Sequence, residues 1–477
     1  MTIDSIDVTE AIANVEDLLR KEQTLSPALI AAIQVILLVV KLLTDRIGLN
    51  SRNSSKPPSS DFNRDKSSRN ISKNKIGGQF GHKGSLLQPV SDPDEIKWLN
   101  VNSHDLGKDH SYEDLGFEKR QVINIRLSRH VIEFRAQILQ NENGQRCIAD
   151  FPAGVTRPIQ YGASVKAHAV YLSLFQLLPY ERVETHFSEQ FGMSLSTGSL
   201  VNFNREVYGY LALFESIACR QLANSDLIHA DETGINVNGK GFWLHNASNE
   251  KWTLLAPHKK RGRIAMDDIG ILQNFSGVLC HDHWKPYYQF SCLHALCNAH
   301  HLRELTRAFE QDGQEWAEEL HRLLNDMNNA VIDAGGVLAV EDALAYRKQY
   351  QAVLDKADIE CPAPESVDTT KKRGRQKRSR SRNLLERLRN YEDDTLRFLE
   401  NIHVPFTNNQ GERDLRMTKV QQKISGCFRS FEGAEVFCRI RSYISTCQKH
   451  DVGIGTALEC LFDGKCPAFI QKIIDSG

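Results

Sequence analysis

Three acidic residues stand at predicted element boundaries in the second half of the chain. Asp231 follows the apolar run in LIHADETG, and Asp282 ends a second apolar run in GVLCHDHW. Glu412 lies in the first turns of a helix predicted to begin after the polar residues 407–409, which are candidate caps. We expect neighbouring strand ends to bring the two aspartates together, with the glutamate offered by a helix packed on the sheet.

Clustered carboxylates of this kind predict a Mg²⁺ site, with Mn²⁺ as a substitute. Mg²⁺ prefers oxygen ligands and binds through a few carboxylates, water and substrate phosphate. Two such ions roughly 3.5–4 Å apart can activate an attacking hydroxyl and stabilise the leaving oxygen at phosphorus. Without a cation the carboxylates would repel and raise one another's pKa. A single Asp at a strand end is more often a turn residue, so the prediction of phosphoryl transfer depends on all three acids together.

A stripe of cations follows Glu412 along the same predicted helix. Arg416, Lys419 and Lys423 come four, seven and eleven residues later, which places them on one helix face. We expect this face, and Arg416 and Lys419 above all, to contact DNA phosphates. The alternative is a solvated face with one internal Glu to Arg pair worth about 0.2–0.5 kcal/mol.

Two further motifs lie close to the acidic residues. Trp284 would either stack on an unpaired base, worth about 1–3 kcal/mol, or form a wall of the pocket. Cys297 and His300 form a Cys-x-x-His pair in the sequence CNAH. The pair would either bind zinc or pack in the core and orient the site. We favour the second interpretation, because oxygen ligands and not thiols match Mg²⁺.

Basic residues are concentrated in two blocks, although the net charge of the 477-residue chain is only −1. Residues 51–90 carry eight Lys or Arg against two Asp, and residues 371–382 carry eight basic residues and no acid. Either block could neutralise phosphates, and either by itself also fits a solvated, disordered linker. The second block supplies four expected DNA contacts: Lys371, Lys372, Arg373 and Arg375.

Cysteine usage predicts a cytoplasmic protein. The eleven cysteines show no regular framework, and no charged-then-apolar leader with a cleavage site is present. A reducing interior is the natural compartment for such a chain. The most apolar stretch, residues 28–43, is interrupted by Gln34 and Lys41 and is shorter than a bilayer requires, so we expect no membrane contact.

The first third of the chain divides into three predicted segments. Residues 1–50 form an N-terminal helix with an a/d heptad seam, which favours a coiled coil, although an ordinary buried helix is the alternative. Residues 51–92 form a basic flexible linker. Residues 93–157 form a small β-rich module, because residues 117–140 alternate between apolar and polar as half-buried strands do.

The rest of the chain predicts an α/β multidomain enzyme. Three strands, a fourth strand at 277–282 and then a helix from about residue 298 are the order expected of a ribonuclease H-like central catalytic domain. Before it, two helices joined through Gly192 resemble a helix-turn-helix, with Ser199, Asn202 or Asn204 as conjectural groove contacts. The predicted divisions are a helical region at 158–222, the catalytic domain at 223–302 and 401–450, a helical insertion at 303–400 and a C-terminal helical segment at 451–477.

The chain resembles the insertion sequence 66 family of transposases across nearly its whole length. The stretches that carry the resemblance occur in the family's order: NSSKPPSSD, GGQFGHKG, RPIQYGASVKA, QLLPYERV, HADETG, CHDHWKPY, CNAHHLREL, RNLLERL and VPFTNNQGERDLRMTKVQQKISGCFRS. The resemblance implies a DDE triad on a ribonuclease H-like core, falling on Asp231, Asp282 and Glu412. Motif position thereby favours this trio over the adjacent carboxylates Glu232 and Asp414, which spacing alone does not exclude.

The chain departs from the family where a cysteine zinc-binding module usually lies, between the linker and RPIQYG. Only Cys147 is present there, whereas structural zinc needs four ligands, commonly from Cys-x-x-Cys pairs. Zinc binding by His104, His110 and Cys147, without cysteine pairs, is the less favoured alternative. We therefore expect Mg²⁺ and not zinc as the cofactor.

The resemblance implies binding of transposon ends, metal-dependent cleavage there and strand transfer into target DNA. Pairing of two ends calls for a homodimer or higher oligomer, and small accessory proteins of the same element are expected partners. Two alternatives remain open. One is a catalytically inactive DNA-binding relic, and the other is a ribonuclease H-like nuclease without strand transfer.

Overall fold

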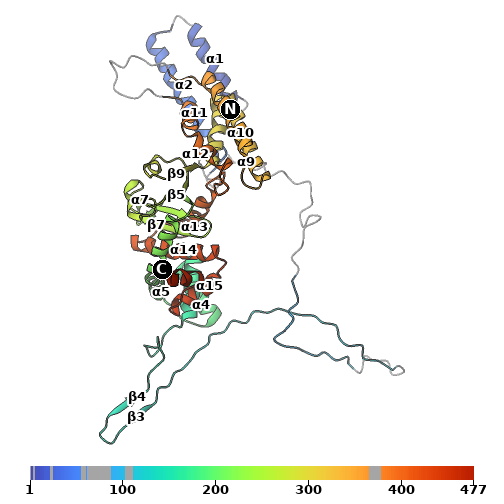
Figure 1. The fold of residues 1–477 in the computed structure, drawn as a ribbon, viewed down its shortest axis with the longest axis vertical. Helices are drawn as coiled ribbons and strands as arrows, with labels where there is room; N and C mark the ends of the chain where they lie inside the picture. Colours follow the sequence, from blue (N-terminus) through green and yellow to red (C-terminus); the bar gives the residue numbers. More distant parts are fainter. Residues whose placement is uncertain are drawn as a thin grey trace.

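The computed structural model of the 477-residue chain describes residues 2–3, 6–21, 25–54, 61, 87–102, 111–364 and 378–476. A mixed α/β core is confirmed, with a sheet at its centre and helices around it (Figure 1). Most of the basic segment at 51–92 lies outside the described residues, as do His104 and His110.

The central sheet has five strands in the order β7-β6-β5-β8-β9. Strands β5 (Leu227–Val237), β6 (Lys240–Ser248) and β7 (Thr253–His258) form an antiparallel meander. Strands β8 (Val278–His281) and β9 (Leu293–Leu296) continue the sheet in parallel on the other side of β5. The predicted three-strand meander and the fourth strand are thus confirmed.

Gly277 allows β8 to begin against β5. A Cβ at this position would lie 2.5 Å from the carbonyl oxygen of Asp226 and 2.7 Å from that of Ser225. The next amide, on Val278, donates to the same Asp226 oxygen at 2.8 Å. Because only glycine tolerates this close backbone approach, Gly277 fixes where the parallel pairing of the two strands starts.

Helices α13 (Asn409–Ser425) and α14 (Phe431–Lys449) pack on the meander, the first on β5 and β6 and the second on β7. The side-chain hydroxyls of Ser442 and Thr446 accept hydrogen bonds from the backbone amides of Leu255 and Thr253. These amides face the outer edge of β7. Helix α14 therefore supplies hydrogen-bond acceptors to the edge strand β7, whose amides could otherwise pair with another strand.

A helical layer, formed by helices before the sheet in sequence and by the last two helices of the chain, shares the hydrophobic core of the sheet. Helix α4 (Tyr180–Phe191) ends at Gly192, whose φ of 58° is left-handed, and α5 (Thr197–Tyr210) begins after Ser196, whose Oγ accepts from the amide of Ser199. The predicted helix, turn and helix are thus present. The other members of the layer are α3 (Ala163–Val170), a π-helix (Tyr171–Phe175), α6 (Ala212–Ala223), α15 (Ile454–Phe462) and α16 (Ala468–Ser476).

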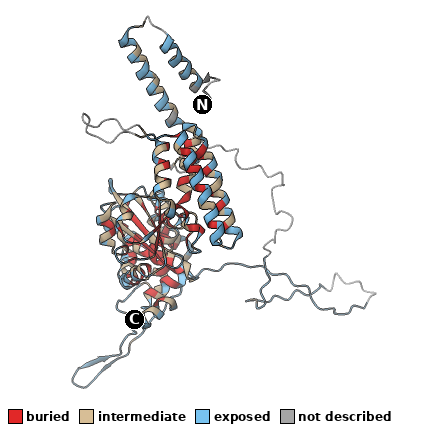
Figure 2. Ribbon diagram, turned by 45° about the horizontal axis from the view of Figure 1, so that its top comes forward, coloured by how far each residue is buried: buried red, intermediate tan, exposed pale blue. Residues whose placement is uncertain are grey.

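A second helical unit follows the sheet and has a core of its own. Its helices are α8 (Asn298–Asp312), α9 (Glu315–Asp333), α10 (Val340–Glu360), α11 (Arg380–Asn390) and α12 (Glu392–Leu396). This core includes Val278, Cys280 and Ala295 from β8 and β9, so the unit is built onto one face of the sheet. Figure 2 shows the buried residues in the sheet and on the inner sides of these helices.

The N-terminal segment contains two helices instead of the single helix predicted over residues 1–50. Helix α1 (Val8–Lys21) follows two short paired strands, β1 (Thr2–Ile3) and β2 (Ile6–Asp7), and α2 (Pro27–Ile47) starts separately. Ser26 caps α2 by accepting from the amide of Leu29 at 3.3 Å, and Pro27 occupies the first helical turn. A capping serine followed by proline is a helix start, which explains the division.

Helix α2 is exposed along its length, as Figure 2 shows. It is long and apolar enough to cross a membrane by length and composition, and none of Pro27–Thr44 is buried. The helix extends beyond the apolar run at both ends, so the argument from length does not hold, and the expectation of no membrane contact stays a prediction. Length and apolar composition do not by themselves distinguish such a helix from one that packs against another protein surface.

The described part of residues 93–157 does not form the predicted β-rich module. In the described residues from 87 to 157, the only strands are β3 (Ile138–Gln140) and β4 (Arg146–Ile148), a short antiparallel pair. The alternating residues before them are extended and exposed, with Val122 83% and Ile125 87% exposed. Alternation supplies an apolar face, but no second layer from the described residues covers it, so these side chains are not half-buried as predicted.

Candidate active site

The strand register brings Asp231 and Asp282 side by side. Strands β5 and β8 pair in parallel from Leu227 with Val278 to His229 with Cys280. Continued two residues further, the same register sets Asp231 opposite Asp282. Asp231 therefore lies in the middle of β5, which runs on to Val237 with β6, and not at a strand end as predicted. What ends beside it is the shorter strand β8.

Helix α13 presents Glu412 to the same sheet face, and Asn408 fixes where that helix begins. The side-chain Oδ1 of Asn408 lies 2.7 Å from Nδ1 of His229, and its Nδ2 donates to the carbonyl of Ala230 at 2.9 Å. Its backbone amide donates to Sγ of Cys297 at 3.1 Å. Three contacts thus tie the N-terminus of α13 to β5 and to the start of α8, one turn before Glu412.

Asn246 supplies a further tie between the strands and α13. It pairs with Asp231 across β5 and β6, so both side chains lie on one face of the sheet. Its Nδ2 donates to the carbonyl of Gly411 at 3.2 Å, while its Oδ1 is buried and has no partner within the described part of the chain. A buried, unpaired amide oxygen beside an acidic cluster fits a site for a hydrated cation.

The electrostatics of the site show that the three acids interact. The pKa of Asp231 rises from 3.8 to about 8, mainly because the group is buried. The negative charges of Glu232, Asp282 and Glu412 raise it further, while a hydrogen bond from the amide of Glu232 opposes the rise. Without a cation, Asp231 is therefore protonated in much of the neutral range.

The two competing carboxylates are already neutralised elsewhere. Glu232 points to the opposite sheet face, because neighbouring strand residues alternate, and its fully buried carboxylate pairs with Arg261 at 2.6 Å. Tyr287 donates a second hydrogen bond to it at 2.6 Å. Asp414 pairs with the ammonium group of Lys449 at 2.9 Å. Both acids thus have a cationic partner, although the charge of Glu232 still acts on Asp231.

The trio itself lacks such partners. Asp231 and Asp282 each accept one hydrogen bond from a backbone amide, at 2.8 and 3.2 Å. Among the described residues, neither aspartate nor Glu412 forms an ion pair with Lys, Arg or His. Oxygen donors without a protein counter-charge are the set that Mg²⁺ or Mn²⁺ would bind, so the residues fit such a cation.

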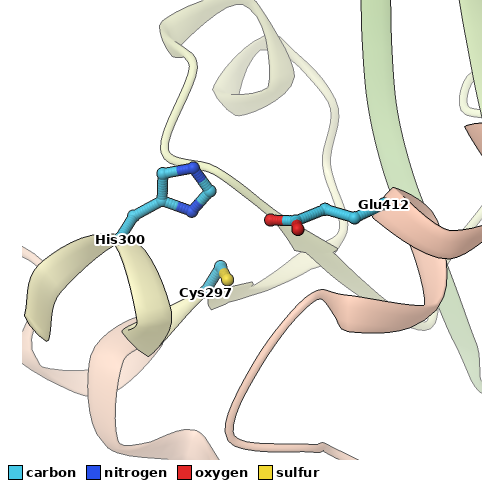
Figure 3. Close-up of side chains that lie close together, drawn as sticks. All are labelled: Cys297, His300 and Glu412. Carbon is cyan, nitrogen blue, oxygen red and sulfur yellow. The ribbon is translucent and has the colours of Figure 1, made fainter. Parts of the chain in front are cut away.

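Cys297 and His300 lie beside Glu412, as Figure 3 shows. Cys297 is the N-cap residue of α8, and His300 lies in the first turn of that helix. The ligand atoms of Cys297, His300 and Glu412 all lie within 4.8 Å of one another. Burial lowers the pKa of His300, which keeps its imidazole neutral, and raises the pKa of the Cys297 thiol. The sequence placed this pair near the site but did not predict its closeness to Glu412.

The cations of α13 differ in their surroundings. Arg416 is exposed and makes no hydrogen bond or ion pair with any residue that the structure describes, so the internal pair with Glu412 is not formed. Lys419 donates to the carbonyl of Gly234 at 2.7 Å, and partial burial lowers its pKa. Lys423 is exposed further along the helix. Only Lys419 is thus held against the meander by a hydrogen bond to a strand carbonyl.

Trp284 takes part in a stack that the sequence did not predict. The guanidinium of Arg261 lies 4.2 Å from the ring centroid of Trp284 and 4.7 Å from that of Trp243. Arg261 thus lies over both indole rings while it pairs with Glu232. Trp284 is half-buried and is held by this packing.

The remaining expected DNA contacts fall in three places. Lys371, Lys372, Arg373 and Arg375 lie outside the described residues. The end of the same basic run is engaged internally, because Arg382 pairs with Asp358 at 2.5 Å and Arg378 pairs with Glu386. Asn204 is buried and bonds to the Tyr180 hydroxyl, so it is not available for groove contact, whereas Asn202 is exposed.

The chain is thus an α/β protein in which Asp231 lies on a mixed sheet and is influenced electrostatically by Asp282 and Glu412. Residues 158–436 match the model of the Transposase IS66 family, and residues 2–88 match that of a family of unknown function (DUF6444). The first match covers more than half of the chain, which therefore belongs to the Transposase IS66 family. No curated protein matches it. Membership in this family supports a transposase role and implies DNA binding.

The cysteines of the chain form no disulfide in the structure. All eleven cysteines are free, and Cys147 is exposed and alone in its part of the chain. No pair of the kind that zinc fingers use is present among them in that segment.

Proposed function

We propose that this protein is a DDE transposase with a ribonuclease H-like catalytic domain. It binds the terminal inverted repeats of an insertion sequence, cleaves DNA at the element ends and joins the exposed 3′-hydroxyls to target DNA. The observation that carries the proposal is the meeting of Asp231, Asp282 and Glu412 on one sheet face, while Glu232 and Asp414 are paired elsewhere. The order of a three-strand meander followed by two parallel strands supports the same fold.

The proposed roles follow from the positions of the side chains. Asp231, Asp282 and Glu412 hold the divalent cations, with Asn408 orienting α13 so that Glu412 faces the strands. When bound, two Mg²⁺ ions would activate the attacking hydroxyl and stabilise the leaving oxygen. The partly buried setting of Asp231 strengthens these charge interactions relative to bulk water.

Two exchanges at phosphorus make up the proposed reaction. In the first, water attacks the phosphodiester at the element end, the bond to the 3′-oxygen breaks, and that oxygen leaves as a hydroxyl after taking up a proton. In the second, this hydroxyl loses its proton and attacks a target phosphodiester, whose own 3′-oxygen leaves. The number of phosphodiester bonds is conserved in the second exchange, so no external energy source is required.

Binding to DNA is proposed to use the exposed cations of α13 and the basic run at 371–375. Arg416 and Lys423 are exposed on the helix that carries Glu412, so a strand held at the site would pass them. Phosphate contacts of this kind release counterions and make binding strongly dependent on salt. Trp284 is proposed as a wall of the same site.

Self-association is proposed to involve α2. Its apolar side chains Leu29, Ile36, Leu43 and Ile47 repeat at heptad spacing and are each about half exposed. Pairing with a second copy would cover them. Two copies would also hold the two ends of the element together, which strand transfer requires.

The test is incubation of the purified protein with labelled element-end DNA and a target plasmid in Mg²⁺ or Mn²⁺. Asp231→Asn, Asp282→Asn and Glu412→Gln should each abolish cleavage and joining while DNA binding persists. Glu459→Gln, an exposed acid on α15, is the matched control and should remain active. Cleavage without joined product would indicate a nuclease, and metal-independent binding without any cleavage by the wild type would indicate an inactive relic.

A further inference from the structure

A mixed sulfur, nitrogen and oxygen cluster adjoins the acidic trio and shares one residue with it. We propose that Cys297, His300 and Glu412 form a binding site for a thiophilic divalent cation, with Zn²⁺ the best suited, and that its occupancy withdraws Glu412 from the oxygen-ligand site. The second half of the proposal rests on the proposed function, whereas the binding of Zn²⁺ does not. Neither role follows from the Transposase IS66 family match.

The geometry is close to that of a three-residue zinc site. The ligand atoms lie within 4.8 Å of one another, and Figure 3 shows the three side chains directed toward a common space between α8 and α13. Bond lengths of about 2.0–2.3 Å in tetrahedral zinc sites put neighbouring ligand atoms roughly 3.3–3.8 Å apart. Side-chain rotations that move each atom by about an ångström would close the cluster without moving either helix.

The two helix starts hold the ligands in place from both sides. Cys297 is only 1% exposed, and its Sγ accepts the backbone amide of Asn408 at 3.1 Å. An amide that donates to sulfur stabilises the thiolate, which is the form that binds a metal. The same Asn408 is bonded to His229, so the sulfur and the N-terminus of α13 are fixed to one another.

Two ligand groups of the cluster have no protein partner. Nδ1 of His300 is buried without a hydrogen-bond partner in the part of the chain that the structure describes. Glu412 forms no ion pair with Lys, Arg or His there. A buried ring nitrogen without a partner carries a desolvation cost of about 1–3 kcal/mol, which a coordinated cation can remove.

The donor set selects the kind of cation. Thiolate and imidazole are soft or intermediate ligands that favour Zn²⁺ over Mg²⁺, whereas three carboxylates favour the reverse. Three protein ligands also leave a fourth position for water, as in zinc sites that are not purely structural. Because one carboxylate serves both clusters, Zn²⁺ and the Mg²⁺ set compete for Glu412.

Co²⁺ and Zn²⁺ are the probes for binding, and neither measurement uses DNA. Addition of Co²⁺ to the full-length protein should produce the thiolate charge-transfer band and the visible bands of tetrahedral coordination, and Zn²⁺ should displace them at one ion per chain. Cys297→Ser should remove the charge-transfer band, and His300→Gln should weaken binding at least about tenfold. Cys292→Ser, a half-buried cysteine outside the cluster, is the control and should leave the band and the affinity within about twofold of the wild type.

A site on another cysteine would overturn the assignment. The proposal fails if wild-type protein gives no charge-transfer band, or if the band persists in Cys297→Ser with the thermal transition unchanged. His300→Gln guards against a misfolded Cys297→Ser variant, because it alters an intermediate-exposure residue and leaves the buried sulfur in place. Asp231→Asn should still bind Zn²⁺, since Asp231 is outside the cluster, and loss of binding in that variant would also contradict the proposal.

The competition is measured separately, as the ratio of Mg²⁺-dependent cleavage rates with and without added Zn²⁺. In the wild type this ratio should fall at least about tenfold at saturating Zn²⁺. In His300→Gln, the Zn²⁺ concentration that gives half of this inhibition should rise by the same factor as the Kd for Zn²⁺ in the binding assay. Binding of Zn²⁺ with no effect on cleavage would overturn the withdrawal of Glu412. Binding of Zn²⁺ in a protein that never cleaves would leave the site established and count against the proposed function instead.

Discussion

His229 and Asn408 are joined by a side-chain hydrogen bond of 2.7 Å that links β5 to the start of α13. His229 stands two residues before Asp231, and Asn408 stands four residues before Glu412. The bond therefore connects the backbones that carry two of the three acids. Both partners are buried, so little water competes for it.

Replacing Asn408 should uncouple Glu412 from the strands. Asn408→Ala removes the bonds to His229 and Ala230 and leaves both partners buried, which should cost about 1–3 kcal/mol for each unsatisfied group. The measured effect should be a higher Mg²⁺ requirement and a lower kcat, with DNA affinity nearly unchanged. Asn409→Ala, at the exposed neighbouring position, is the control. Equal losses in both variants would mean that Asn408 serves only general stability.

The stability of the cation-free protein should depend on pH through Asp231. Its pKa is about 8 in the folded protein against 3.8 otherwise, so the folded state holds a proton that the unfolded chain releases between these values. The free energy of unfolding should therefore fall as pH rises from about 4 to about 8. Thermal unfolding in a chelator at about pH 5 and about pH 8 measures this difference. An Asp231→Asn variant with the same slope as the wild type would contradict it.

Mg²⁺ should reverse that loss at the higher pH. A ligand that binds only the folded state at about a hundred times its Kd adds about 2.7 kcal/mol to the free energy of unfolding. The gain should be large at pH 8, where the carboxylates are charged, and small at pH 5. Asp282→Asn should reduce it, because one oxygen ligand is lost. An equal Mg²⁺ gain at both pH values would indicate binding away from the trio.

Gly277→Ala should disrupt the pairing of β5 with β8. The added Cβ would lie 2.5 Å from the carbonyl oxygen of Asp226, and only a backbone shift can relieve this contact. We expect a destabilisation of about 2–4 kcal/mol, in the range of other severe packing changes. Gly241→Ala, where an added Cβ meets nothing within 4 Å, should change stability by less than about 1 kcal/mol. Denaturant unfolding compares the two variants.

Arg416 and Lys419 should differ in their effects on DNA binding. Arg416→Ala should reduce the slope of log K against log salt by about one, as expected for one lost phosphate contact. Lys419→Ala should lower that slope less and also lower the unfolding temperature, because Lys419 donates to the Gly234 carbonyl in the free protein. Filter binding across a salt series measures the slopes. Identical slopes for Arg416→Ala and the wild type would remove Arg416 from the interface.

Local patterns predicted the strands that position the acids. The apolar runs before Asp231 and Asp282 gave the correct strands. In the structure, β5 and β6 are joined by a hairpin turn at Asn238 and Gly239, both with positive φ. The sequence did not show that β5 continues past Asp231. That continuation depends on pairing with β6, and Ile235 and Val237 bury their side chains only because α13 and the rest of the core cover them.

Residue spacing did not predict the ion pairs between residues that are far apart in the sequence. The pairing of Glu232 with Arg261, and of Asp414 with Lys449, excludes both acids from the trio, yet neither partner lies within a helical or strand repeat of its acid. The alternation at 117–140 failed as a predictor of burial for a related reason. An alternating sequence predicts one apolar face of a strand, but it does not predict which other part of the protein buries that face.

The helical unit α8–α12 lies between Asp282 and Glu412 in the sequence. During translation, both aspartates and the residues of the second hydrophobic core are therefore synthesised before Glu412. Until α13 has emerged and docked through Asn408, the nascent chain carries an incomplete ligand set. Under the proposed function this order has a consequence, because a truncated or half-made copy would lack Glu412 and with it the complete set of proposed ligands.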